Sequence, residues 1–64
     1  MTREPLKLNR ITFHGKVIME VYDEFEGVWT YYLTDGGVMH NIYSTGSQLN
    51  SDDLQWLEDR GYLN

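Results

Sequence analysis

The residues of this sequence best suited to acid–base or metal chemistry are ten carboxylates and two histidines, and the chain has no cysteine. Most carboxylates fall in two clusters: Glu20, Asp23, Glu24 and Glu26, then Asp52, Asp53, Glu58 and Asp59. Adjacent carboxylates in turns and at helix starts are normally solvated, whereas a general acid needs an apolar pocket that raises its pKa. A chain of 64 residues has little room for such a pocket. We therefore expect no enzyme activity and no catalytic residue.

The histidines give no sign of a metal site. His14 falls in an expected turn and His40 in the middle of an expected strand, so nothing in the sequence brings the two rings together. A two-histidine metal site would need both rings on one ion with help from carboxylates, and the lack of cysteine excludes thiolate zinc sites. The glycines at 36, 37 and 46 lack the helix or the lysine of a phosphate-binding loop. We expect no metal and no cofactor.

Charge is divided unevenly along the chain. Residues 1–16 carry four basic residues against Glu4, a balance of +3, and residues 17–64 carry nine acids against Arg60, a balance of −8; these sum to the net charge of −5. An acidic surface repels nucleic acids and anionic membranes and attracts basic protein surfaces. Spaced carboxylates can also imitate a phosphate backbone, as a DNA mimic does. The alternative interpretation is a solvated surface that keeps a small protein in solution.

The nine aromatic residues exceed what so small a core can bury. We expect Phe13, Trp29 and Tyr31 in the core with Leu33. Phe25 lies between acids in an expected hairpin tip, so it is the main candidate for a partner contact. The expected partner-binding residues combine the two acidic clusters with two aromatic rings: Glu20, Asp23, Glu24, Phe25, Glu26, Asp52, Asp53, Trp56, Glu58 and Asp59.

Four stretches with the periodicity of strands occupy most of the chain. The expected strands cover 8–13, 16–23, 28–34 and 38–43, and turn residues separate them at 14–15, 23–27 and 35–37. The apolar residues change parity between Leu8 and Ile11, which predicts a β-bulge near Asn9 and Arg10. The short connections predict an antiparallel meander.

A short helix is expected over residues 51–60. Asn50 and Asp53 have the spacing of a capping box, and Gly61 is placed for a left-handed stop. Leu54 and Leu57 form its buried stripe. A helix of this length must dock on the sheet. The expected fold is α+β, a four-stranded antiparallel meander with one short C-terminal helix packed on it. The alternative is a small, strongly curled barrel of the SH3-like kind.

The sequence is expected to form a single domain over residues 1–64, with residues 1–5 as a flexible tail. No apolar run is long enough to cross a bilayer, and the start of the chain lacks the pattern of a signal peptide. We therefore expect a cytoplasmic location.

These observations favour a non-enzymatic protein-binding module. Its expected role is that of an acidic inhibitor or regulator of a larger basic partner that handles nucleic acids. Phages and mobile elements often encode small acidic proteins of this class, which suggests such an origin. One alternative is a structural protein that assembles as a homo-oligomer through its sheet edges. Another is a nucleic-acid binder that uses the basic N-terminal segment, although the net charge opposes it.

Overall fold

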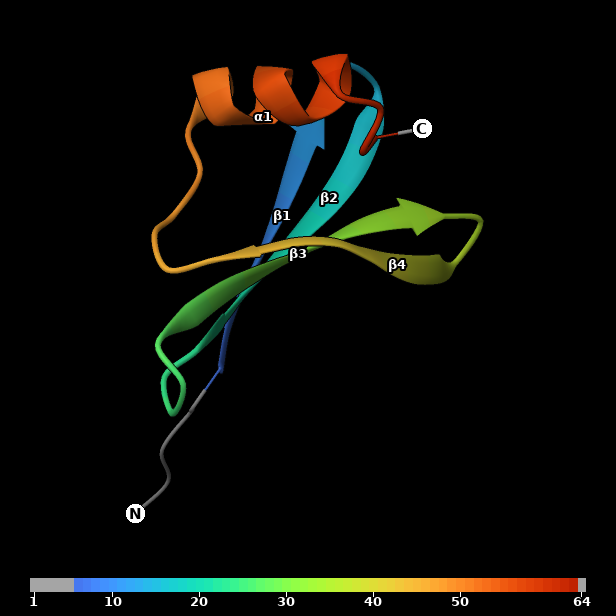
Figure 1. The fold of residues 1–64 in the computed structure, drawn as a ribbon. Helices are drawn as coiled ribbons and strands as arrows, with labels where there is room; N and C mark the ends of the chain where they lie inside the picture. The colour runs from blue at the N-terminus through green and yellow to red at the C-terminus, as the bar shows by residue number, and fades with distance from the viewer. Residues whose placement is uncertain (1–5, 64) are drawn as a thin grey trace.

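A computed structural model describes residues 6–63, which form one four-stranded antiparallel sheet and one helix (Figure 1). The elements are β1 (Leu6–Phe13), β2 (Lys16–Asp23), β3 (Val28–Asp35), β4 (Val38–Thr45) and α1 (Ser51–Asp59). Each strand pairs with the next along the chain, so the expected meander with one helix is confirmed. The sheet is open, with β1 and β4 at its edges, and the barrel alternative is therefore wrong. The expected tail, residues 1–5, lies outside the described residues.

Two of the three hairpins turn through two residues with positive φ. The values are 51° and 78° at His14 and Gly15, and 59° and 86° at Gly36 and Gly37. Turns of this kind match the right-handed twist of the flanking strands. His14 adopts this conformation although it has a β-carbon, and its ring stacks on Phe13 with the centroids 4.0 Å apart. Both turns lie where the sequence predicts them.

The irregularity in the sheet lies in β4, so the predicted bulge in β1 is wrong. The pairing of β1 with β2 runs without interruption from Leu6–Asp23 to Phe13–Lys16. In the pairing of β3 with β4, Tyr31 pairs with Tyr43 but Tyr32 pairs with Asn41, which leaves Ile42 as the extra residue.

The parity change at Leu8 has another cause, the apolar character of both faces of the sheet. The face that bears Ile18 and Tyr31 packs against α1, and we call it the covered face. The opposite, open face carries apolar side chains as well: Leu8, Val17, Met19, Val21, Val28, Tyr32 and Met39. Leu8 belongs to this open face and is 63% exposed. A parity rule identifies the buried face only when the other face is polar.

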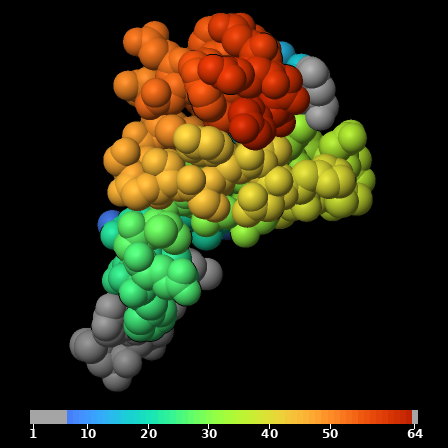
Figure 2. Space-filling model, viewed as in Figure 1, coloured from blue at the N-terminus to red at the C-terminus, as the bar shows by residue number. Residues whose placement is uncertain are grey.

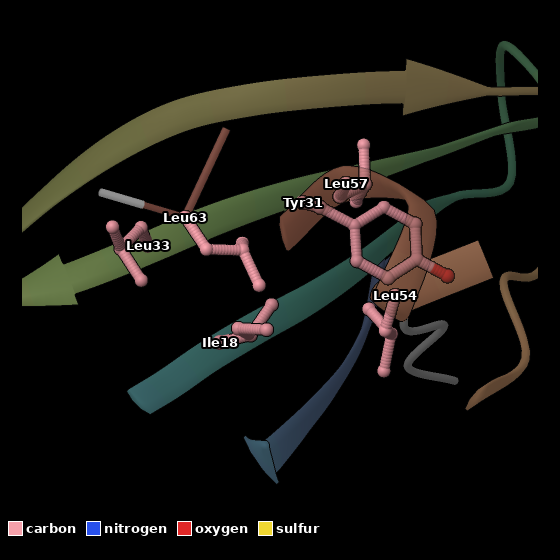
Figure 3. Close-up of a cluster of buried hydrophobic side chains, with 6 residues drawn as sticks. All are labelled: Ile18, Tyr31, Leu33, Leu54, Leu57 and Leu63. Carbon is pink, nitrogen blue, oxygen red and sulfur yellow. The ribbon is translucent and has the colours of Figure 1, made fainter. Parts of the chain in front are cut away.

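The core is a single cluster between the covered face and α1 (Figure 3). It contains Ile18 from β2, Tyr31 and Leu33 from β3, Leu54 and Leu57 from α1, and Leu63 from the C-terminal segment. The expected buried stripe of the helix is thus confirmed. Leu63 is a core residue that sequence reasoning missed, because it lies beyond the end of the helix.

Both ends of α1 have the predicted caps. The Asn50 side chain accepts a hydrogen bond from the Asp53 amide at 2.9 Å, and the Asp53 carboxylate accepts one from the Asn50 amide at 3.2 Å. At the C-terminus, Gly61 has a φ of 87°, and the Tyr62 amide donates to the Leu57 carbonyl at 2.9 Å. This left-handed stop turns the chain back and places Leu63 in the core.

Candidate partner-binding surface

The β2–β3 hairpin tip projects from the body of the molecule (Figure 2). The Asp23 carboxylate accepts hydrogen bonds from the amides of Phe25 at 2.9 Å and Glu26 at 3.4 Å. Asp23 therefore holds the turn, as aspartate often does at this position. Glu24, Phe25 and Glu26 are exposed, and we call these three residues the acidic tip. Phe25 is 76% exposed, so its ring does not fold back on the sheet.

Glu20 is buried, and its predicted place on an acidic surface is wrong. Only 1% of its surface is exposed. Its carboxylate accepts hydrogen bonds from the Tyr31 hydroxyl at 2.6 Å, from Asn9 Nδ2 at 2.9 Å and from Gln48 Nε2 at 3.1 Å. The physical reason is its parity, because Glu20 shares the covered face with Ile18 and lies directly across from Tyr31 in the sheet.

This buried network has a structural role. The Leu49 amide donates to the Tyr31 hydroxyl at 2.8 Å, so the network links β1, β2 and β3 to the segment that precedes α1. Burial, and then the hydrogen bond to Glu20, raises the pKa of the Tyr31 hydroxyl well above its ordinary value. The phenol thus stays protonated and acts as a donor to the carboxylate.

Three aromatic rings gather where α1 meets β4, and we call them the aromatic cluster. Tyr43 lies 6.1 Å from Trp56 and 6.0 Å from Tyr62, and Trp56 and Tyr62 are also 6.0 Å apart, all between ring centroids. Trp56 and Tyr62 are 43% and 42% exposed. The guanidinium carbon of Arg60 lies 4.9 Å from the centroid of the Trp56 ring. Of these three rings, only Trp56 was among the expected partner-binding residues. The helix stop brings Tyr62 to it, and Tyr43 comes from a distant strand.

A cleft of about 340 Å³ opens beside this cluster, between β4 and α1. Its lining residues are Tyr43, Leu49, Asp52, Asp53, Trp56 and Leu57. Asp52 and Asp53 lie four and three residues before Trp56, a spacing that puts all three on one side of a helix. Asp53 also serves in the capping box, whereas Asp52 is exposed and makes no hydrogen bond or ion pair within residues 6–63. The cleft therefore combines apolar walls with an acidic rim.

The other acids of α1 have contacts of their own. Glu58 Oε1 lies 2.8 Å from His14 Nδ1 and accepts a hydrogen bond from Gln55 Nε2 at 3.1 Å. Glu58 thereby ties the β1–β2 turn to the helix. Asp59 is exposed and accepts from the same Gln55 amide group at 3.0 Å. Glu58 and Asp59 lie outside the lining of the cleft.

The two predicted acidic clusters do not form one continuous surface. The acidic tip and α1 lie at opposite ends of the molecule (Figure 1), whose longest dimension is 41 Å. Of the predicted partner-binding residues, the structure brings together only Asp52, Asp53 and Trp56 at one cleft. The two ends therefore form separate candidate contacts.

Two features, a metal-binding group and a membrane-spanning helix, are absent from the part of the chain that the structure describes. Residues 6–63 contain no group of three or more histidine, cysteine or acidic side chains that could hold a metal ion. The one helix within this range is too short and too polar to span a membrane. Comparison of the chain with family models, with curated proteins and with solved structures finds no match.

Proposed function

We propose that this chain is a non-enzymatic protein-binding module that contacts a larger, basic partner through the cleft between β4 and α1. The observation that carries the proposal is the position of the exposed Trp56 ring beside the carboxylates of Asp52 and Asp53. Tryptophan and tyrosine are the residues that most often anchor protein interfaces. Partly exposed rings next to a cleft are therefore ready contacts for a partner.

The acidic surroundings indicate the charge of that partner. The chain has a net charge of −5, and its described acids flank both candidate contacts. Complementary charge raises the rate of association and excludes partners of the same sign. Proteins that handle nucleic acids expose basic grooves, so we propose that the chain inhibits or regulates such a protein in the cytoplasm.

The acidic tip provides a second contact in this proposal. It projects from the end of the molecule that lies away from α1 (Figures 1 and 2). A partner that touches both the tip and the cleft must extend along much of the module, whose longest dimension is 41 Å. This requirement fits a large partner rather than a peptide.

The open face of the sheet favours a second candidate function, assembly with further copies of the chain. Leu8 and Met39 on this face are exposed, and no described element covers it. The unpaired edges of β1 and β4 could also pair with other chains. In that case the partner would be the same protein, and the oligomer would form without any other component.

Capture experiments distinguish the two functions. Wild type, Trp56→Ala and the control Asp35→Asn are immobilised and exposed to a cell lysate at several salt concentrations. The control removes an exposed charge that does not line the cleft. We expect basic proteins to be retained by wild type and Asp35→Asn, to be lost with Trp56→Ala, and to be released as salt rises. Equal retention by Trp56→Ala, with its folding verified by circular dichroism, would contradict the proposal. Retention of the chain's own copies alone would favour assembly.

A further inference from the structure

We infer that the cleft between β4 and α1 receives the guanidinium group of an arginine side chain from the partner. This inference rests on the proposed function and specifies its chemistry. Three features of the cleft support it: the nature of its walls, the charge at its rim and a contact that the chain already makes with its own arginine.

The walls of the cleft suit a long side chain with a flat cationic end. Tyr43 and Trp56 present two rings whose centroids are 6.1 Å apart and whose planes are inclined by 65°. Aromatic rings attract cations through the negative charge of their faces. Leu49 and Leu57 complete the apolar lining and can contact the methylene groups of an arginine.

The rim selects for positive charge. Asp52 has no partner within residues 6–63, and Asp53 uses only Oδ2 in the capping box, which leaves its Oδ1 able to accept. An anionic group would be repelled by both carboxylates. A purely apolar side chain would shield the two carboxylates from water without pairing with their charge, and burial of an unpaired charge costs free energy.

The chain shows that this aromatic cluster accepts a guanidinium group. Arg60 places its guanidinium carbon 4.9 Å from the centroid of the Trp56 ring. Arg60 itself does not line the cleft, whereas the Trp56 ring that it contacts does. Arginine fits better than lysine, because its planar group stacks on rings and binds carboxylates through two hydrogen bonds, whereas an ammonium is compact and strongly hydrated.

Titration with three short peptides tests the inference. The full chain, labelled with ¹⁵N, is titrated with acetyl-Gly-Arg-Gly-amide and with the matched lysine and citrulline peptides. The indole N–H signal of Trp56 reports on the cleft, and that of Trp29 is an internal control, because Trp29 lies on β3 and does not line the cleft. We expect the arginine peptide to shift the Trp56 signal with a Kd on the order of 1 mM, as a single small contact gives. Equal affinity for the lysine or the citrulline peptide would overturn the inference.

Two variants test the role of the rim. Asp52→Asn should weaken binding of the arginine peptide about two- to fivefold, whereas the control Asp35→Asn should leave it unchanged. Equal losses in the two variants would overturn the inference, because they would indicate attraction by net charge alone. The proposed function fails separately, when Trp56→Ala retains the same partners from a lysate as wild type. If Trp56→Ala loses the partners that wild type retains, but the arginine peptide does not bind, the proposed function stands and the inference is wrong.

Discussion

The Tyr31 hydroxyl joins two parts of the chain that are far apart in sequence. It donates to Glu20 and accepts from the Leu49 amide, so it fixes the start of the segment that leads to α1. The sequence predicted Tyr31 in the core, but it did not predict its polar partners. The alternation of side chains along the strand could have placed Glu20 on the covered face with Ile18. The charge of Glu20 instead favoured an exposed position on an acidic surface.

Tyr31→Phe should destabilise the fold. The substitution keeps the ring but leaves the Leu49 amide and one oxygen of Glu20 without their partner, which costs about 1–3 kcal/mol. Urea unfolding followed by circular dichroism measures this loss. A free energy of unfolding equal to that of wild type would show that water replaces the hydroxyl without cost.

The same hydroxyl predicts a dependence of stability on high pH. Its pKa in the folded state is raised above the ordinary value of about 10, so the unfolded chain releases this proton first. The contribution of this hydroxyl to the free energy of unfolding should not change with pH below pH 10. Above pH 10 it should decrease, by up to about 1.4 kcal/mol per pH unit. Tyr31→Phe should lack this component when its alkaline unfolding is compared with that of wild type. Parallel curves for the two proteins would contradict the assignment.

Phe25 should matter for binding and not for stability. Its ring is exposed at the acidic tip, so Phe25→Ala should change the free energy of unfolding by less than about 1 kcal/mol. At an interface the same ring can contribute about 2 kcal/mol or more. The measurements are a melting curve and the capture of partners from a lysate. A variant that melts like wild type and also retains every partner would show that the tip has no binding role.

The charges of the acidic tip require a separate variant. Glu24→Lys with Glu26→Lys should slow association and reduce its dependence on salt, because rim charges act mainly on the rate of encounter. Capture across a salt series measures this effect. Capture by the double variant that matches wild type at every salt concentration would eliminate the tip as an electrostatic contact.

At the scale of elements, the short turns and the caps were predicted from particular residues. Glycine pairs and capping side chains act locally, so Gly36, Gly37, Asn50 and Gly61 identify their structures without knowledge of the fold. The aromatic cluster was not predicted as a unit. It depends on the bulge at Ile42 and on the position of α1 beside β4, and both involve elements that are far apart in sequence.

The docking of α1 should be essential for folding. Leu57 is buried in the core, and truncation of a buried leucine costs about 2–5 kcal/mol, against a total near 5 kcal/mol for a small domain. Leu57→Ala should therefore be partly unfolded at 25 °C by circular dichroism. The matched control is Leu8→Ala on the open face, which should melt close to wild type because Leu8 is largely exposed. Similar melting of both variants would contradict the docking of the helix.

At the scale of the whole molecule, the sequence predicted the meander and the helix, but it did not predict how the acids are distributed. The two predicted acidic clusters are divided between a projecting tip, a buried network at Glu20 and the two ends of α1. The separation between the acidic tip and α1 depends on the length and twist of the sheet. Among the predicted partner-binding residues, Asp52, Asp53 and Trp56 line one cleft, because a single helix brings them together.

The central claim is that a partner binds beside α1, and site-specific photo-crosslinking tests it most directly. A photoreactive p-benzoylphenylalanine replaces Tyr62 in the aromatic cluster or, as a matched control, Tyr32 on the open face of the sheet. Both positions hold partly exposed tyrosines, so the two variants should fold alike. In lysate, the probe at position 62 is predicted to crosslink to a basic protein, and the probe at position 32 is not. Crosslinks to a partner from position 32 alone, or only between copies of the chain, would contradict the account.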